Sequence, residues 1–395
     1  MKRLSIQNLF LSEQRVLLRV DFNVPLQKDG IIIDDTRIKL ATTSIEYIVS
    51  QRGKLILLSH LGRPRGVVDP NLSLSPCAKQ LSKLIQRPVK LAPDCIGVKV
   101  SQIVRKMKPS DIVLLENLRF HRQEENPHNG DFASCLAKLG DCYVNDAFAT
   151  SHRAHSSITL LPTLFPGKAA AGFLMEKEIA TLSPLITSPK RPFHIIVGGS
   201  KVRTKINVLY SLLDKIDCIY LGGAMAFTFL KAQGHDVGDS YYDEVSIPRA
   251  CNLLALCREK MVRVYLPEDV IVTASTQSKS RVVPSTKIKS GWMGLDIGPN
   301  TVAIWSSALG KASTIFWNGP LGVWERDEFS RGTRDLARAL STLSSTTVAG
   351  GGDLTAALRH FQLAKKFSYI STGGGASLEF LQQGHLPGID ALSPV

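Results

Sequence analysis

The sequence has no long hydrophobic run and few aromatic residues. No segment approaches the roughly 18 consecutive apolar residues that a membrane-spanning helix needs, and the opening "MKRLSIQNLFLSEQRVLLRV" has neither the apolar core nor the cleavage site of a signal peptide. Aromatic residues make up only 7% of the chain, so a surface for stacking nucleic-acid bases is not evident. We therefore expect a cytoplasmic protein without a membrane partner.

Several common site motifs are also missing. The seven cysteines are scattered and form no Cys-x-x-Cys pair, which is typical of reduced thiols in a cytosolic protein. The histidines are not clustered with the cysteines along the chain, so a zinc site is not predicted. Neither G-x-x-x-x-G-K-[ST] nor G-x-G-x-x-G occurs, which excludes a P-loop and disfavours a dinucleotide-binding Rossmann site.

The net charge is strongly positive, at +14. Such a charge suits either a nucleic acid or a small anionic substrate. The basic residues are spread along the chain, with no block of five or more lysines and arginines. Charge alone does not choose between the two kinds of partner.

A chain of 395 residues is long enough for two domains. Short apolar segments alternate with amphipathic segments of helical length such as 36–52 and 74–86, which predicts parallel sheets covered by helices. The expected strands are 16–24, 54–61, 88–92, 111–120, 141–148, 193–199, 218–224, 262–272, 313–320, 345–353 and 367–375. A strand-free helical stretch at 171–186 interrupts the alternation. We therefore predict an α/β protein with two Rossmann-like parallel-sheet domains, 1–170 and 171–395, joined by a hinge helix.

Glycines follow strand after strand in the second half. They are Gly198-Gly199, Gly222-Gly223, Gly319, Gly350-Gly351-Gly352 and Gly373-Gly374-Gly375. Any one group is explained by a tight turn between strand and helix. Five groups at the carboxyl ends of parallel strands favour a ligand-binding edge, because glycine lets backbone amides approach a phosphate closely.

Charged side chains near these glycines fit a nucleotide. In "IIVGGSKVRTK" (195–205), Lys201 and Lys205 lie one helical turn apart, at a helix start that suits an anion. Asp353 closes "GGGD" and is a candidate Mg²⁺ ligand, although an acidic residue there is also a common helix cap. Glu325 is a weaker candidate for ribose hydroxyls.

The strand ends of the first half carry charged and polar groups instead of glycines. These are Asp21, Asn23, Arg37, His60, Arg63, Arg119, His152 and Arg153. Each arginine alone is explained by a surface salt bridge. Together they predict a basic site for a small, highly anionic substrate, because guanidinium groups match phosphate and carboxylate.

At this point the residues resemble a known family. The shared motifs are "RVDFNVP", "SHLGRP", "LLENLRF", "NDAFATSHRAHSS", "GGSKVRTK", "WMGLDIGP", "FWNGPLGVWE", "AGGGD" and "STGGGAS". Their order and spacing resemble the phosphoglycerate kinase family from about residue 15 to 390. The resemblance implies reversible phosphoryl transfer from 1,3-bisphosphoglycerate to MgADP in glycolysis, after hinge-bending domain closure near 171–186, in a cytoplasmic monomer.

The resemblance also implies roles for individual residues. The first domain would bind 3-phosphoglycerate through Asp21, Asn23, Arg37, His60, Leu61, Gly62, Arg63, Arg119 and Arg153. The second would bind ATP or ADP through Lys201, Lys205, Gly294, Asn318, Glu325, Gly351, Gly352, Asp353 and Leu354, with Asp353 holding Mg²⁺. Catalysis would rest on Arg37, Lys201, Gly352 and Gly375, and the C-terminal tail would pack on the first domain.

Three departures from the family pattern affect details. Leu354 stands where the family usually has Thr or Ser, and Ala149 where it commonly has Gly. The segment 269–292 matches poorly, so the adenine pocket is least defined there. Two alternatives stay open: a catalytically silent nucleotide-binding relative, for which Leu354 is the best support, and a basic nucleic-acid-binding protein.

Overall fold

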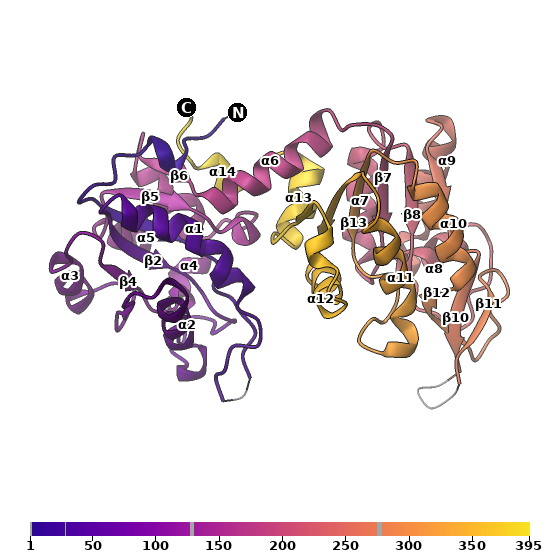
Figure 1. Ribbon diagram of the computed structural model, residues 1–395, viewed down its shortest axis with the longest axis horizontal. Coiled ribbons are helices and arrows are strands. Elements are labelled where there is room, and N and C mark those ends of the chain that lie inside the picture. The colour runs from indigo at the N-terminus through magenta and orange to yellow at the C-terminus, as the bar shows by residue number, and fades with distance from the viewer. Residues whose placement is uncertain (1, 28, 127–129, 275–278) are drawn as a thin grey trace. The chain divides into compact units, whose positions relative to one another are not determined.

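The computed structural model describes residues 2–27, 29–126, 130–274 and 279–395, and its chain forms two compact units (Figure 1). Unit 1 comprises Met1–Ala180 and His385–Val395, and unit 2 comprises Thr181–Gly384. The division falls inside α6 (Phe173–Thr187), the helix expected at 171–186, and lies ten residues beyond the boundary placed after residue 170. No helix in the described ranges is both long and apolar enough to cross a membrane.

Unit 1 is built on a six-stranded parallel sheet with the order β3-β4-β2-β1-β5-β6. The strands are β1 (Arg15–Arg19), β2 (Lys54–Leu58), β3 (Lys90–Leu91), β4 (Ile112–Leu114), β5 (Cys142–Asn145) and β6 (Ala169–Ala171). The two central strands, β1 and β2, are buried along almost their whole length. Uninterrupted apolar strands of this kind need helices on both faces of the sheet.

The helices of unit 1 bury one face each. They are α1 (Thr36–Ser50), α2 (Ser75–Ile85), α3 (Val98–Arg105), α4 (Arg122–Glu125), α5 (Gly130–Ala137) and α14 (Pro387–Asp390). In α1 the buried residues Ile38, Ala41, Ile45 and Ile48 recur at intervals of three and four, which places them on a single stripe. The stripe packs into the core with β1 and β2.

The C-terminal residues of the chain complete unit 1. The amide of Leu4 donates to the carbonyl oxygen of Ser393 at 2.8 Å, and the amide of Ser393 donates to Ala169 in β6 at 2.9 Å. A bridge between Arg3 and Pro394 extends this pairing. Both ends of the chain are therefore anchored at the β6 edge of the same sheet, and Figure 1 shows them side by side.

Unit 2 repeats the architecture with a parallel sheet ordered β15-β14-β13-β7-β8-β9. The strands are β7 (Phe193–Val197), β8 (Cys218–Leu221), β9 (Arg263–Tyr265), β13 (Thr314–Asn318), β14 (Thr346–Gly350) and β15 (Tyr369–Ile370). The helices are α7 (Val202–Leu212), α8 (Gly223–Ala232), α9 (Ile247–Glu259), α10 (Pro299–Leu309), α11 (Arg331–Leu340), α12 (Gly352–His360) and α13 (Gly375–Gln383). Two parallel sheets flanked by helices confirm the predicted fold class.

One prediction about unit 2 was wrong. The segment 262–272 is two strands in different sheets, because Pro267 follows the end of β9 and the chain leaves the parallel sheet there. Its second part is the middle strand of a three-stranded antiparallel sheet. That sheet consists of β10 (Asp269–Thr273), β11 (Arg281–Pro284) and β12 (Met293–Ile297). Asp269 then turns its carboxylate to the start of α10, where it accepts from the amide of Thr301 at 2.7 Å.

Most strands end earlier than predicted, and side chains or glycines explain why. The strand expected at 141–148 stops at Asn145, whose side-chain oxygen accepts from the amide of Ala147 at 3.0 Å. The strand expected at 313–320 stops before Gly319, whose φ is +87°. The other predicted strands that overrun are 16–24, 54–61, 88–92, 111–120, 193–199, 218–224, 345–353 and 367–375. Most of the charged and glycine residues of the motifs therefore lie in the loops and helix starts after the strands, whereas Gly294 and Asn318 lie within β12 and β13.

Candidate functional site

A group of basic side chains gathers at the carboxyl ends of the strands in unit 1. We call it the basic cluster, and it consists of Arg19, Arg37, His60, Arg119 and Arg153. Arg19 ends β1, Arg37 lies in the first turn of α1, and the other three lie in the segments after β2, β4 and β5. Since these strands are neighbours in a parallel sheet, their ends meet at one edge.

Hydrogen bonds hold the predicted substrate-binding residues of this cluster to one another. Nη1 of Arg37 donates to Oδ2 of Asp21 at 2.6 Å and to the carbonyl oxygen of Asn23 at 3.2 Å. The side-chain oxygen of Asn23 accepts from the amide of Gly62 at 2.9 Å, and Nη1 of Arg119 donates to the carbonyl oxygen of Gly62 at 2.7 Å. The structure therefore brings these residues together around the turn at Gly62.

Positive charge exceeds negative charge in the cluster. Burial and then the charges of Arg19 and Arg119 hold the pKa of His60 well below its ordinary value. The same two arginines, after burial, help to lower the pKa of His155 to about 3. The contribution of the arginines to these lowered pKa values indicates a local positive potential, which attracts an anion.

Several guanidinium donors of unit 1 remain available for such an anion. Within the described residues, the guanidinium groups of Arg63 and Arg153 have no hydrogen-bond or salt-bridge partner; Arg63 is exposed and Arg153 is partly buried. Nε of Arg119 lies 3.2 Å from a carboxylate oxygen of Glu125 but is not aligned for a hydrogen bond, and it is buried. Leu61 is buried and offers only its backbone.

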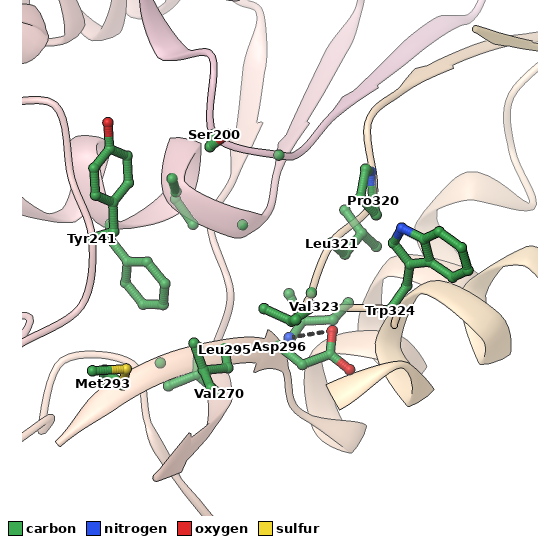
Figure 2. A pocket seen from close by; sticks show the side chains of 18 of the residues that line it. Ser200, Tyr241, Val270, Met293, Leu295, Asp296, Pro320, Leu321, Val323 and Trp324 are labelled. Carbon is green, nitrogen blue, oxygen red and sulfur yellow. Dashed lines mark hydrogen bonds between the residues drawn. The ribbon is translucent and has the colours of Figure 1, made fainter. Parts of the chain in front are cut away.

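Unit 2 contains a cavity of about 360 Å³ at the carboxyl ends of its strands. Figure 2 shows Val270 and Leu295 on one wall, Tyr241 on another, and Leu321 and Trp324 opposite. The lining is mostly apolar, with polar groups at its margins, which is the usual composition of a small-molecule site. Of the predicted nucleotide-binding residues, Gly294, Glu325 and Asp353 line it.

Lys205 lies beneath the glycine turn beside this cavity. Its Nζ donates to the carbonyl oxygens of Gly198 at 2.5 Å and of Asn318 at 3.4 Å. The pKa of this amine is lowered to about 8, mainly by burial; the charge of Asp353 opposes the shift and that of Lys201 adds to it. Burial disfavours the charged form of this amine in the free protein, and a bound anion would stabilise that charged form.

The start of α12 presents backbone amides next to the same residues. Gly351 has a φ of +98°, and Gly352 and Asp353 form the exposed first turn. Nδ2 of Asn318 is buried, has no hydrogen-bond partner among the described residues, and would lie 3.0 Å from a Cβ at Gly351. Because Gly351 has no side chain, the unpaired Nδ2 of Asn318 and the first backbone amides of α12 can lie close together. Phosphate sites commonly use donors of this kind.

The remaining predicted residues take different positions. Lys201 precedes α7 and is exposed, and Gly375 begins α13 behind Gly374, whose φ is +54°. Leu354 is fully buried in the core of unit 2, so only its backbone can face a ligand, while the hydroxyl of the next residue, Thr355, bonds to Gly352. Ala149 is absent from the positive-φ residues, so glycine is not needed there.

Sequence reasoning did not single out several residues at these sites. Asp296 lines the cavity, and burial raises its pKa to about 8. Trp324 also lines it, with a buried indole nitrogen that has no hydrogen-bond partner among the described residues. Arg19 is completely buried. An arginine inside an apolar strand was a visible signal; the other two positions were not recognisable before folding.

Folding groups one cysteine with an aspartate and a histidine, which their spacing along the chain did not indicate. The chain brings Cys95 together with Asp94 and His121, whose ligand atoms all lie within 4.8 Å of one another. The close contact is explained without a metal, because His121 bonds to Asp94 at 2.6 Å and the thiol donates to the carbonyl oxygen of Glu116 at 3.0 Å.

The segment 269–292, which matches the family pattern poorly, is described only in part. Its residues 275–278 lie outside the described residues.

Comparison with known proteins agrees with this geometry. A family model described as phosphoglycerate kinase matches residues 6–384. The phosphoglycerate kinase of Chlorobaculum tepidum is 48% identical, with both chains covered completely, and the cytosolic phosphoglycerate kinase of Nicotiana tabacum is 47% identical, with 98% of this chain and 97% of that one covered.

Solved structures give the same result. The structure of phosphoglycerate kinase from Coxiella burnetii covers 99% of this chain, with 98% of its own chain matched, a TM-score of 0.87 and 39% identity. The enzyme from Pyrococcus horikoshii OT3 covers 98% of each chain with a TM-score of 0.85 and 29% identity. With its basic cluster in one unit, its glycine-edged cavity in the other, and relatives that match both from end to end, this chain belongs to the phosphoglycerate kinase family.

Proposed function

We propose that this chain is a phosphoglycerate kinase that transfers a phosphoryl group between 1,3-bisphosphoglycerate and MgADP, yielding 3-phosphoglycerate and MgATP. The observation that carries the proposal is the basic cluster, in which Arg19, Arg37 and Arg119 surround neutral His60. A nucleotide site alone would fit many kinases. A separate site with such excess positive charge fits a small substrate that carries both a phosphate and a carboxylate.

Unit 1 supplies the glycerate contacts in this proposal. Arg37 and Asp21 hold each other in place, so the remaining donors of Arg37 are oriented before substrate arrives. The open donors of Arg63, Arg119 and Arg153 suit the substrate phosphate. Asn23 and the turn at Leu61 and Gly62 shape the floor of the site.

Unit 2 supplies the nucleotide contacts. The apolar cavity with Leu295 and Val323 suits a purine ring, and Glu325 at its margin suits ribose hydroxyls. Lys205, Asn318 and the amides that begin α12 suit the phosphates. Lys201 and the start of α13 at Gly375 are assigned to the phosphoryl group in transfer.

Mg²⁺ fits the residues present beside the phosphate groups. Asp353 is an exposed carboxylate at the cavity, without a hydrogen-bond or ion-pair partner among the described residues. Hard oxygen ligands of this kind are what Mg²⁺ prefers when it also binds phosphate. When bound, the ion would neutralise phosphate charge.

The chemistry needs no general base. The carboxylate of 3-phosphoglycerate is already ionised near neutral pH, so the protein has only to align the reactants and stabilise charge on the transferring group. Arg37 from unit 1 and Lys201 with the amides of Gly352 and Gly375 from unit 2 are assigned to that task. Because the two sets of residues belong to different units, the proposal includes closure of the units around α6. Small-angle scattering that detects no compaction with both ligands bound contradicts closure.

A coupled assay tests the proposed function. The purified protein receives 3-phosphoglycerate and MgATP, and NADH oxidation is followed through glyceraldehyde-phosphate dehydrogenase. Turnover should require both substrates and Mg²⁺. Folded protein that binds MgADP without turnover would instead be a silent relative, and protein that binds neither substrate would refute the proposal.

A further inference from the structure

Arg19 is the one member of the basic cluster that is completely buried, and no substrate contact has been assigned to it. Its Nε donates to the hydroxyl of Ser157 at 3.0 Å, and its Nη1 donates to the carbonyl oxygen of Val20. Its Nη2 lies 3.2 Å from Nδ1 of His60. All of its terminal groups are therefore directed at fixed partners within unit 1.

The contact with His60 determines which nitrogen of the imidazole carries the proton. A guanidinium group has five donors and no acceptor, so Nδ1 of His60 must accept from it. The ring is 2% exposed and surrounded by arginines, and it is neutral. A neutral ring with an accepting Nδ1 carries its proton on Nε2, which has no hydrogen-bond partner among the described residues.

A buried carboxylate fixes Arg19 in turn. The hydroxyl of Ser157 accepts from Arg19, so its single hydrogen is directed to Oε1 of Glu124, at 2.6 Å. The amide of Ser157 donates to Oε2 of the same carboxylate at 3.0 Å. Glu124 is completely buried, which raises its pKa, while the charge of Arg19 and the hydrogen bonds from Ser157 oppose that rise. A continuous series of hydrogen bonds thus runs from Glu124 through Ser157 and Arg19 to His60.

We propose that Arg19 is a positioning residue that locks His60 in the Nε2–H tautomer and so presents a fixed hydrogen-bond donor to the phosphate of the glycerate substrate. This inference rests on the proposed function, because it requires that substrate in unit 1. Without Arg19, the ring can place its proton on either nitrogen and rotate. The donor facing the substrate is then present only part of the time.

Nuclear magnetic resonance of the unliganded full-length protein tests the tautomer directly. Protein labelled with ¹⁵N in histidine distinguishes protonated from unprotonated ring nitrogens by their chemical shifts, and His60→Gln identifies the signals. The expected result is an unprotonated Nδ1 and a protonated Nε2 at neutral pH. A protonated Nδ1 overturns the proposal. This measurement needs no substrate and no altered Arg19.

A double-mutant cycle tests whether Arg19 acts through His60. Arg19→Met should raise the KM for 3-phosphoglycerate roughly tenfold or more, the scale of one hydrogen bond to a charged group, and should leave the dissociation constant for MgADP unchanged. In a His60→Ala background, the same substitution should change that KM by less than about twofold, because coupled residues are not additive. An equal effect in both backgrounds overturns the proposal.

Arg15→Met is the matched control. Arg15 begins the same strand, β1, and pairs with Asp141, with 2.5 Å between Nη2 and Oδ1. It should leave the KM unchanged. If Arg19→Met does not fold, Ser157→Ala removes one anchor of Arg19 and keeps its charge, and it should still mix the two tautomers of His60 in the ¹⁵N spectrum; an unmixed Nε2–H signal overturns the role of the series from Glu124.

The outcomes separate the two proposals. The Nε2–H tautomer in a protein without kinase turnover would refute the proposed function and leave the hydrogen-bond series intact. Normal turnover with an Nδ1–H tautomer would refute the positioning role and leave the function intact.

Discussion

Nη1 of Arg37 lies 2.6 Å from Oδ2 of Asp21. The carboxylate is nearly buried, whereas the side chain of Arg37 is 38% exposed. The pair therefore fixes one edge of the guanidinium and leaves another edge open. Because the Arg37 side chain already holds this position before substrate binds, little further side-chain ordering is needed on binding.

Arg37→Ala should lower kcat by roughly 10²–10³, the scale seen when a preorganised donor to a transition state is lost. The dissociation constant for MgADP should stay the same, since the proposed nucleotide contacts lie in unit 2. Steady-state kinetics and a nucleotide titration check both values. Lys39→Ala, on the same helix with its own ion pair to Asp35, is the control. Weakened MgADP binding with normal turnover would contradict the assignment of substrates to units.

Nucleotide affinity should depend on pH through Lys205. The pKa of its amine is lowered to about 8 in the free protein, and phosphate favours the charged form. Affinity for MgADP should therefore be level below about pH 8 and fall as the pH rises above it. Calorimetry in buffers of different ionisation enthalpy should also detect proton uptake on binding near pH 8.

Lys205→Met supplies the comparison for that experiment. It should raise the KM for nucleotide by roughly tenfold or more, because one charged hydrogen bond is lost, and its affinity should not change between pH 7 and 9.5. A pH dependence that persists in this variant would assign the titration to another group.

Gly319→Ala should weaken nucleotide binding by displacing Lys205. A Cβ at Gly319 would lie 2.3 Å from Nζ of Lys205 and 2.5 Å from the carbonyl oxygen of Gly198. Gly234→Ala is the control, because its φ of +85° imposes a similar backbone cost of about 1–2 kcal/mol while its Cβ would meet nothing within 4 Å. Both variants should lose stability in thermal unfolding, and only Gly319→Ala should raise the nucleotide KM.

Asp353→Asn should raise the Mg²⁺ concentration needed for half-maximal activity, because a neutral amide is a poorer ligand for this ion. Binding of ADP measured without Mg²⁺ should not weaken. Isothermal titration calorimetry of ADP binding, with and without Mg²⁺, checks this expectation. Equal Mg²⁺ requirements in the variant and the natural sequence would contradict a metal-binding role for Asp353.

Much of the fold follows from local pattern, and the exceptions have physical causes. The buried parallel strands were recognisable because each is a short apolar run. The run 262–272 was misjudged because apolar residues on both sides of Pro267 look like one strand, while only pairing partners distant in the chain decide which sheet each half joins.

The candidate sites were predicted where motifs carry charge or glycine at strand ends. Glu124 and Ser157 were not singled out, because their link to Arg19 depends on segments far apart in sequence meeting in a closed core. The orientation of the Leu354 side chain was also not predictable from the motif. Its place in the motif suggested a ligand contact, whereas helical geometry turns its side chain into the core and brings the Thr355 hydroxyl to Gly352.

The return of residues His385–Val395 to unit 1 has a consequence for synthesis of the chain. Residues 1–180 emerge from the ribosome first. The amide of Leu4 and the carbonyl oxygen of Ala169, which pair with Ser393, lack these hydrogen bonds until Ser393 has emerged. Unit 2 is continuous and is complete before then. During translation, the domain that is begun first is therefore the last to be finished.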